Sequence, residues 1–358
     1  MNDFAVPAGL REGLRQWPSP DAEAWLTQLP ATVQELAERW SLQPGEPYDP
    51  GGASAWVAPA VDGTGTPCVL KIGRPHTEAR DEAAALEAWA GAGAVRLLKS
   101  DPAGLLLEEC RPGRSLREQP EPEQDVILTQ LLKRLWLEPL PGHPFRPLQQ
   151  MCEEWASSLD PELPESVRAA DLLQSLPVSA ERHVLLATDL HAGNVLSAER
   201  EPWLAIDPKP YLGDPAYDVT QHLLNCPERL RTDATGTAQR VAELAGVEPE
   251  RVKAWLYARL VHLAPMPGWS WALKVARELD IRPIANQANS ESEVSVAEER
   301  GKEFDGVPIG RPANGALIDA GYATVADLPE DLDELLKLHG VGPKAVRLLR
   351  SERTNSRA

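Results

Sequence analysis

The segment from Leu185 to Leu224 contains residues whose types and order suit phosphoryl transfer. Asp189 is followed five residues later by Asn194, and Asp207 comes eighteen residues after Asp189. A carboxylate can orient a substrate hydroxyl and accept its proton, while an amide and a second carboxylate can bind a metal ion beside a nucleotide γ-phosphate. Mg²⁺ prefers such oxygen ligands. Each residue alone is better explained as an ordinary loop residue, but the ordered set predicts Asp189 as the general base and Asn194 and Asp207 as metal ligands.

Short apolar runs must position these side chains. VLLA precedes the loop that carries Asp189, and WLAI leads directly into Asp207. Brief apolar runs of this kind are typical of buried strands. We therefore expect short strands around residues 183–206. Helical spacing dominates before them, over residues 125–176, and after them, from Pro215 to about Leu279.

The first 110 residues are predicted to form a small sheet crossed by one helix. AWVAPAV and CVLKI flank DGTG, which predicts a hairpin turn, and VRLLKS and GLLLEE suit two further strands. TEARDEAAALEAWA predicts a helix over residues 77–90. Ahead of the sheet, residues 19–41 are expected to form two helices, with Ser19 capping the first and Pro30 separating it from the second.

The sequence of these segments resembles that of the aminoglycoside/hydroxyurea antibiotic resistance kinases, a streptomycin 6-phosphotransferase-like branch of the protein-kinase-like fold. The likeness is carried by DLHAGNVL, AIDPK and GDPAYDV, and upstream by CVLKIGRP and EARDEAAALEAW, over roughly residues 20–280. It implies an α+β, two-lobed fold with ATP and Mg²⁺ as cofactors. The implied reaction moves the γ-phosphate to a hydroxyl of an aminoglycoside-like cation, with position 6 of streptomycin as the first candidate.

The resemblance also implies roles for residues outside the opening segment. Lys71, in VLKI, matches the lysine that contacts the nucleotide α/β-phosphates, and Glu82 matches its ion-pair partner. Glu78, one turn earlier, is the alternative partner. Leu107 to Cys110, which include Glu108, match the hinge that faces the adenine through backbone groups.

The phosphate-covering loop is the least regular part of the predicted site. PGGASAWV stands where a GxGxxG pattern would be expected, so Gly51, Gly52 and Ser54 are the residues that could approach phosphate. A plain turn is the alternative for this segment. Antibiotic kinases of this fold commonly lack the full glycine pattern, so the resemblance is compatible with it.

The loop that carries Asp189 departs from the family pattern at one point. The family has His-Gly before the catalytic aspartate, and Ala187-Thr188 stand there in this chain. His191 fits the family's Asp-Leu-His pattern and is expected to be structural. Asp214 can cap the helix that begins at Pro215, and Asp218 is expected to brace the catalytic loop.

Composition limits the other classes of function. The chain has 358 residues and 36 Lys+Arg against 54 Asp+Glu, a net charge of −18. This charge suits a cationic small substrate better than a polyanion, and solubility alone explains it equally well. Its four scattered cysteines form no CxxC pair, which argues against a zinc site and a disulfide framework. Neither a transmembrane run nor a signal peptide is predicted, so no membrane contact and a cytoplasmic location are expected.

The last segment carries a separate signal. DELLKL, GVGPK and AVRLLR resemble a helix-hairpin-helix module, in which a tight glycine turn and a helix N-terminus face a phosphate. Nucleic acid or protein is therefore a possible partner. Residues 301–358 have 8 Lys+Arg against 9 Asp+Glu, a net of −1, so the module is not broadly basic. A purely structural hairpin is the alternative.

The predicted organisation is a nucleotide-binding lobe over 1–110, a helical lobe with the catalytic loop over 111–284, a polar linker over 285–302 and the small all-α module over 303–352. Two other functions are also compatible with the sequence. One is a kinase of another small metabolite, because the acceptor pocket is built from scattered side chains. The other is a nucleic-acid-binding or regulatory protein that uses a kinase-like scaffold.

Overall fold

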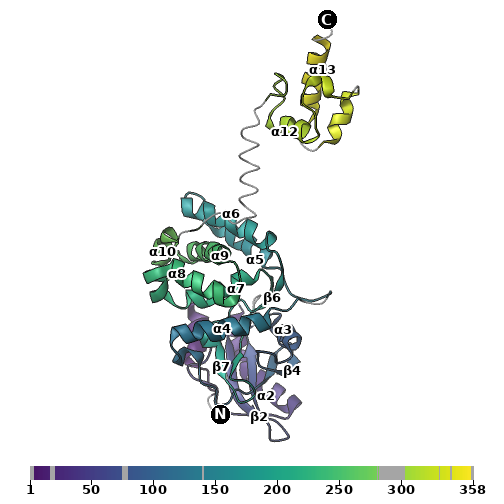
Figure 1. Cartoon of the computed structure of the whole chain (residues 1–358). Helices are drawn as coiled ribbons and strands as arrows, with labels where there is room; N and C mark the ends of the chain where they lie inside the picture. Colours follow the sequence, from purple (N-terminus) through teal and green to yellow (C-terminus); the bar gives the residue numbers. More distant parts are fainter. Residues whose placement is uncertain are drawn as a thin grey trace. The chain divides into compact units, whose positions relative to one another are not determined.

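The computed structural model describes residues 4–16, 21–74, 80–138, 141–279, 281, 303–329, 331–338 and 341–355. The chain divides into two compact units, Met1–Arg282 and Pro283–Ala358 (Figure 1). No helix among the described residues is long and apolar enough to cross a membrane.

A five-stranded antiparallel sheet forms the centre of the first lobe, with strand order β1-β2-β3-β5-β4. The strands are β1 (Gln43–Pro44), β2 (Ala55–Val61), β3 (Pro67–Gly73), β4 (Leu97–Asp101) and β5 (Gly104–Glu108). The DGTG hairpin joins β2 to β3 as predicted, and Asp62 Oδ1 accepts the N–H groups of Thr64 and Thr66 at 2.8 and 2.9 Å. These contacts fix the turn and the β2–β3 register.

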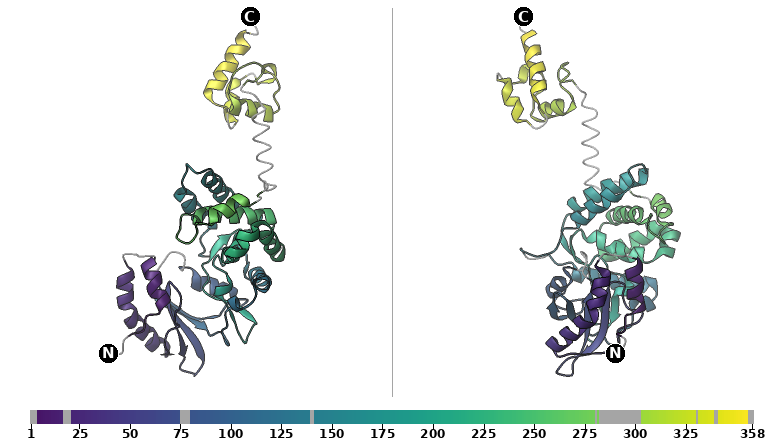
Figure 2. Two further views of the ribbon diagram at one scale, coloured as in Figure 1. Left: turned by 90° about the vertical axis from the view of Figure 1, so that its left-hand side faces the viewer. Right: turned by 180° about the vertical axis from the view of Figure 1, so that it is seen from behind.

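Two helices, α1 (Ala8–Gln16) and α2 (Ala22–Trp40), pack on this sheet through one apolar cluster (Figure 2). The predicted break at Pro30 is wrong, because α2 runs through it. Pro30 is exposed, while Leu29 and Val33 are buried on the other face of the helix. Tertiary packing of that face offsets the roughly 3 kcal/mol that an interior proline costs a helix. Ser19 lies outside the described residues, and α1 was not predicted.

The helix that crosses the first lobe, α3, spans Glu82–Trp89 and is shorter than the predicted 77–90. Arg80 and Asp81 form a turn before it, and Glu78 lies outside the described residues. The helix ends at Ala90, which adopts a left-handed conformation with a φ of 48°. Glu82 therefore opens the first turn of α3.

The second lobe is mainly helical, with two small two-stranded sheets inserted between its helices. The helices are α4 (Glu121–Leu135), α5 (Leu148–Ser158), α6 (Pro164–Val178), α7 (Pro215–Leu224), α8 (Pro227–Ala245), α9 (Pro249–Leu263) and α10 (Ala272–Glu278). Strands β6 (Val184–Leu186) and β9 (Tyr211–Gly213) pair antiparallel, as do β7 (Val195–Ser197) and β8 (Trp203–Ala205). Short 3₁₀ turns, η2 (Leu116–Glu118) and η3 (Ala192–Asn194), complete the lobe. The α+β organisation is as predicted.

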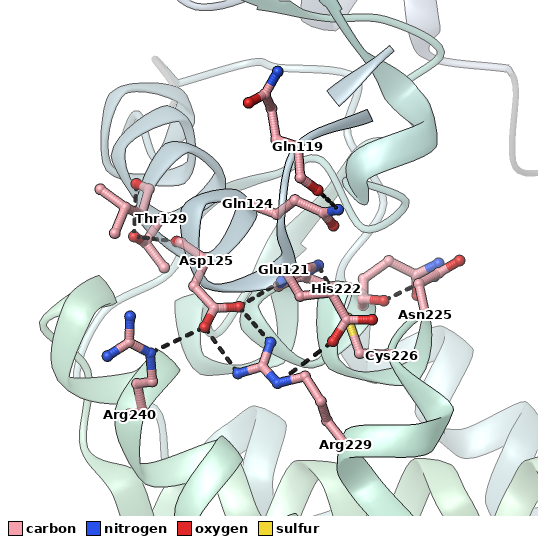
Figure 3. Close-up of polar contacts among 12 residues, drawn as sticks. Gln119, Glu121, Gln124, Asp125, Thr129, His222, Asn225, Cys226, Arg229 and Arg240 are labelled. Atoms are coloured by element: carbon pink, nitrogen blue, oxygen red, sulfur yellow. Dashed lines mark hydrogen bonds and ion pairs between the residues drawn. The ribbon is translucent and has the colours of Figure 1, made fainter. Parts of the chain in front are cut away.

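A buried carboxylate ties three of these helices together (Figure 3). Asp125 on α4 is fully buried and accepts two hydrogen bonds from Arg229 on α8, both at 2.9 Å. It also contacts His222 of α7 at 2.8 Å and Arg240 at 3.1 Å. Because its charge is paired on several sides, the carboxylate fixes α7 against α4 and α8. Gln221, which precedes His222 on α7, reaches the loop that carries Asp189.

The C-terminal unit is a small helical unit with its own core. It contains α12 (Arg311–Asp319), the 3₁₀ turns η4 (Val325–Asp327) and η5 (Leu332–Lys337), and α13 (Pro343–Asn355). Its core includes Phe304, Leu317, Leu332 and Leu349. DELLKL forms a 3₁₀ turn in place of the expected α-helix, and Gly340 of the predicted hairpin lies outside the described residues. The helix-hairpin-helix geometry therefore stays a prediction.

Candidate active site

The predicted lysine–glutamate pair is present between β3 and α3. Lys71 Nζ donates to both carboxylate oxygens of Glu82 at 2.7 Å, and it also contacts Asp207 Oδ1. Lys71 and Glu82 are both buried, at 8% and 4% exposure. Burial alone would lower the pKa of Lys71, but the two carboxylates outweigh it and raise that pKa. The lysine therefore stays charged, as a phosphate contact requires.

These residues border a cavity of about 540 Å³. Lys71, Glu82 and Asp207 line it together with Ser54 and the turn over residues 100–105. The structure thus brings Ser54 to the same cavity as the ion pair. Glu108 and Cys110 do not line this cavity, so their predicted place beside the adenine stays a prediction.

The side chain of Glu108 forms an ion pair with an arginine from the second lobe. Arg200 Nε and Nη2 donate to its two oxygens at 2.8 and 2.9 Å. Burial would raise the pKa of Glu108, but these bonds and a hydrogen bond from the N–H of Arg96 outweigh it and lower that pKa. Burial raises the pKa of the Cys110 thiol to about 11. A fixed carboxylate and a neutral thiol leave backbone groups as the means by which this segment could contact a base.

The loop before Asp189 is held by Asp218 on α7. The Asp218 carboxylate accepts the backbone N–H groups of Ala187 at 3.0 Å and of Thr188 at 2.7 Å. Thr188 adopts a positive φ of 48°, and its hydroxyl donates to the carbonyl of Lys209. The Asp218 carboxylate and the Thr188 hydroxyl thus fix the backbone of the segment where the family has His-Gly. Asp218 braces the loop as predicted.

Asp189 itself is held by two side chains. Lys209 Nζ lies 2.8 Å from its Oδ2, and Gln221 Nε2 donates to its Oδ1 at 2.7 Å. His191 Nε2 is 3.9 Å from Oδ1, and its other ring nitrogen accepts the N–H of Gly193 at 3.0 Å. His191 thus bonds within its own loop, in line with its predicted structural role. Both Asp189 oxygens have fixed partners, so the carboxylate has one defined orientation.

The two predicted metal ligands lie at one end of the β7–β8 hairpin. The carbonyl of Asn194 accepts the N–H of Ile206 at 2.9 Å, which brings Asn194 beside the residue that precedes Asp207. Asn194 Nδ2 donates to the Asp189 carbonyl at 3.0 Å, so its amide nitrogen is committed. Asp207 has a positive φ of 53°, and its side chain is 38% exposed and lines the cavity. An amide oxygen and an accessible carboxylate fit the hard-ligand preference of Mg²⁺.

A second layer of contacts supports α7. Asp214 caps it by accepting the N–H of Ala216 at 3.0 Å, as predicted, and also bonds Trp255 and Arg251. Arg259 of α9 donates to Thr220 Oγ1 at 2.7 Å and to Gln221 Oε1. The amide of Gln221 is therefore fixed at both ends, by Arg259 and by Asp189.

Sequence reasoning missed Lys209, Gln221 and Arg259. Lys209 follows Asp207 by two residues in the DPK triplet, so proximity to a predicted ligand could have indicated it. Gln221 and Arg259 have no local signal, because their contacts depend on how α7 and α9 pack.

Basic residues of the C-terminal unit are engaged within it. Arg353 donates to the carbonyls of Val325, Leu328 and Pro329, and Arg350 pairs with Asp333 at 2.9 Å. These two arginines therefore stabilise the unit. A nucleic-acid or protein partner for it stays a prediction.

A lysine on a small sheet paired with a glutamate on the neighbouring helix, together with an Asp-Asn-Asp set in a helical lobe, is the arrangement of a kinase-like phosphotransferase. The sequence profile of the aminoglycoside/hydroxyurea antibiotic resistance kinases matches residues 39–266. This chain belongs to that family.

Curated relatives extend the match over most of the chain. The streptomycin 6-kinase of Streptomyces griseus is 35% identical over 275 residues, covering 72% of this chain and 88% of its own length. The hydroxyurea phosphotransferase of Kitasatospora aureofaciens is 37% identical over 274 residues, covering 72% and 78%. Among solved structures, a spectinomycin phosphotransferase complex with ADP and spectinomycin has 15% identity and a TM-score of 0.42, covering 74% of this chain and 93% of its own. That structure is too distant to assign roles to residues.

Proposed function

We propose that this chain transfers the γ-phosphate of ATP, with Mg²⁺, to a hydroxyl of an aminoglycoside-like small molecule. The observation that carries the proposal is the contact of the Lys71–Glu82 pair of the first lobe with Asp207 of the second. The second lobe also holds Asp189, whose two carboxylate oxygens have fixed partners. Streptomycin, phosphorylated at position 6, is the first acceptor to test because relatives from two Streptomyces species carry that activity in their names.

In this proposal, each residue has one task. Lys71, fixed by Glu82, neutralises the α/β-phosphates, and Ser54 contributes to the phosphate-covering loop. Asp189 orients the acceptor hydroxyl and takes its proton. Asn194 and Asp207 would hold Mg²⁺, which supplies positive charge next to the transferred phosphoryl group. Catalysis then comes mainly from positioning and charge neutralisation.

The negative charge of the protein is consistent with a cationic acceptor such as an aminoglycoside. The chain has a net charge of −18, and such a field concentrates cationic molecules near the protein. Hydroxyurea is the second acceptor to test, because the Kitasatospora aureofaciens relative is named for it and shares 37% identity. Hydroxyurea is neutral, so salt dependence of the acceptor KM distinguishes the two classes.

An acceptor screen tests the proposal. Purified protein is incubated with ATP, Mg²⁺ and single acceptors, and products are identified by the mass of one added phosphoryl group. We expect a phosphorylated aminoglycoside, with streptomycin first. Phosphorylation of hydroxyurea alone would select the second candidate. Folded protein that binds Mg-ATP but phosphorylates neither class would contradict the acceptor assignment.

A further inference from the structure

The N-terminal helix α1 lies directly against the predicted phosphate-covering loop, Pro50–Ser54. Two glycines of α1, one turn apart, make this contact. A Cβ on Gly9 would stand 2.6 Å from the carbonyl oxygen of Pro50, and a Cβ on Gly13 would overlap the carbonyl oxygen of Ala53. Both positions are too close for any side chain, so helix backbone meets loop backbone.

Hydrogen bonds tie the same two segments together. The N–H of Gly9 donates to the carbonyl of Pro50 at 2.7 Å, and the N–H of Ala8 donates to Asp49 Oδ1 at 2.8 Å. These are N–H groups at the start of α1, which have no partner inside the helix. The loop therefore satisfies donors that α1 cannot satisfy itself.

The far end of the loop is also attached to the N-terminal segment. Trp56 Nε1 donates to the carbonyl of Ala5 at 3.0 Å, and the rings of Phe4 and Trp56 stack at 5.6 Å. Leu10, on α1, is fully buried in the core that α2 and the sheet share. The N-terminal segment is thus fixed to the lobe and can hold the loop at both ends.

The loop leads into the nucleotide cavity. Ser54 and Ala55 line that cavity with Lys71, and the carbonyl of Ser54 accepts the N–H of Arg74, another lining residue, at 2.8 Å. A shift of the loop would therefore move the cavity wall. A loop that is already ordered loses less conformational entropy when nucleotide binds than a free glycine-rich loop would.

We propose that α1 is a brace that orders the phosphate-covering loop, and that Gly9 and Gly13 are positioning residues for nucleotide binding. This role deepens the proposed function and rests on it, because it assumes that ATP occupies the cavity. The brace also explains how the loop could work without the GxGxxG pattern. A loop held in place by α1 does not need to close over the phosphates as a flexible glycine-rich loop does.

Substitution of Gly13 by alanine tests the brace. The new methyl group pushes α1 from Ala53, so we expect the Kd and KM for Mg-ATP to rise on the order of tenfold, equivalent to about 1.4 kcal/mol. The acceptor KM and kcat should change less than about twofold. Titration calorimetry and steady-state kinetics measure these quantities, and thermal unfolding verifies that the variant is folded. A merely structural role would lower the melting temperature without separating the two KM values.

Two controls accompany this variant. Arg11→Ala alters an exposed residue of the same helix, and Gly315→Ala adds a methyl group to a helical glycine with open space around it, so both should keep the wild-type Kd for ATP. If Gly13→Ala does not fold, Asp49→Ala removes the bond to Ala8 without a clash and should raise the ATP Kd in the same direction.

The outcomes separate this inference from the proposed function. If wild-type protein binds ATP and a folded Gly13→Ala or Asp49→Ala variant binds it equally tightly, the brace is overturned and the proposed function stands. Wild-type protein that fails to bind ATP overturns the proposed function and the brace together.

Discussion

Gln221 Nε2 donates a hydrogen bond to Oδ1 of Asp189 at 2.7 Å, which joins helix α7 to the proposed catalytic base. Arg259, buried at 7% exposure, holds the other end of the Gln221 amide and lies over the Tyr217 ring at 4.6 Å. The carboxylate is therefore oriented by a chain of contacts that begins in α9.

Replacing Gln221 by leucine should misplace Asp189 while leaving the nucleotide site intact. We expect kcat to fall about a hundredfold, the scale of a small displacement of a reacting group, with little change in the KM for ATP. Steady-state kinetics measure both values. Gln239→Leu, an exposed glutamine of α8, is the matched control. A wild-type kcat in Gln221→Leu would remove the residue from this role.

The Lys71–Glu82 pair should govern use of the nucleotide. Glu82→Gln removes the charge that fixes Lys71 and leaves the lysine to Asp207. We expect kcat/KM for ATP to fall by on the order of tenfold or more, because the phosphate contact loses its orientation. Glu87→Gln, an exposed position on the same helix, should behave as wild type. Equal kcat/KM values for the two variants would contradict the predicted pairing role.

Asp218 should contribute to both stability and turnover. Asp218→Ala leaves the N–H groups of Ala187 and Thr188 without their acceptor, and each buried unpaired group costs about 1–3 kcal/mol. We expect a lower free energy of unfolding and a reduced kcat, since the strained φ of Thr188 loses its support. Urea unfolding measures the first quantity. Asp171→Ala, an exposed aspartate of α6, should change neither.

The buried Asp125 cluster should make the protein sensitive to acid (Figure 3). Burial would raise the pKa of Asp125, but His222 and Arg229 outweigh it and hold that pKa well below its ordinary value of 3.8. A lowered carboxyl pKa stabilises the folded state above about pH 4, and this stabilisation is lost as the pH falls through the folded-state pKa.

Asp125→Asn tests that dependence. At pH 7 the variant should lose about 3 kcal/mol of unfolding free energy, because two arginines are left without their buried anion. The difference from wild type should shrink as the pH drops below about 4. Denaturant unfolding of both proteins from pH 7 to pH 3 measures it. A difference that stays constant over this range would contradict the lowered pKa.

The positions of many candidate site residues were predictable because these residues lie in or beside short apolar runs. Asp189, Asn194 and Asp207 follow or flank apolar strands, and Lys71 precedes Glu82 at the spacing of a strand and a helix. Those local relationships persist in the structure.

Features that depend on packing between distant segments were not predictable. Pro30 lies within a continuous helix because the opposite face is buried. The helix α1 has two glycines in nine residues, which lowers its intrinsic helix propensity; its contact with residues 50–53 supplies what the local sequence lacks. Gln221 reaches Asp189 only because Asp125 and Arg259 fix α7.

Phosphoryl transfer through Asp189 is tested directly by one comparison. Wild-type protein and Asp189→Ala are each given Mg-ATP and streptomycin, and the antibiotic is weighed by mass spectrometry. We expect a gain of one phosphoryl group with wild type and none with Asp189→Ala, although both proteins bind Mg-ATP. Equal phosphorylation by the two proteins would contradict the proposed role of Asp189.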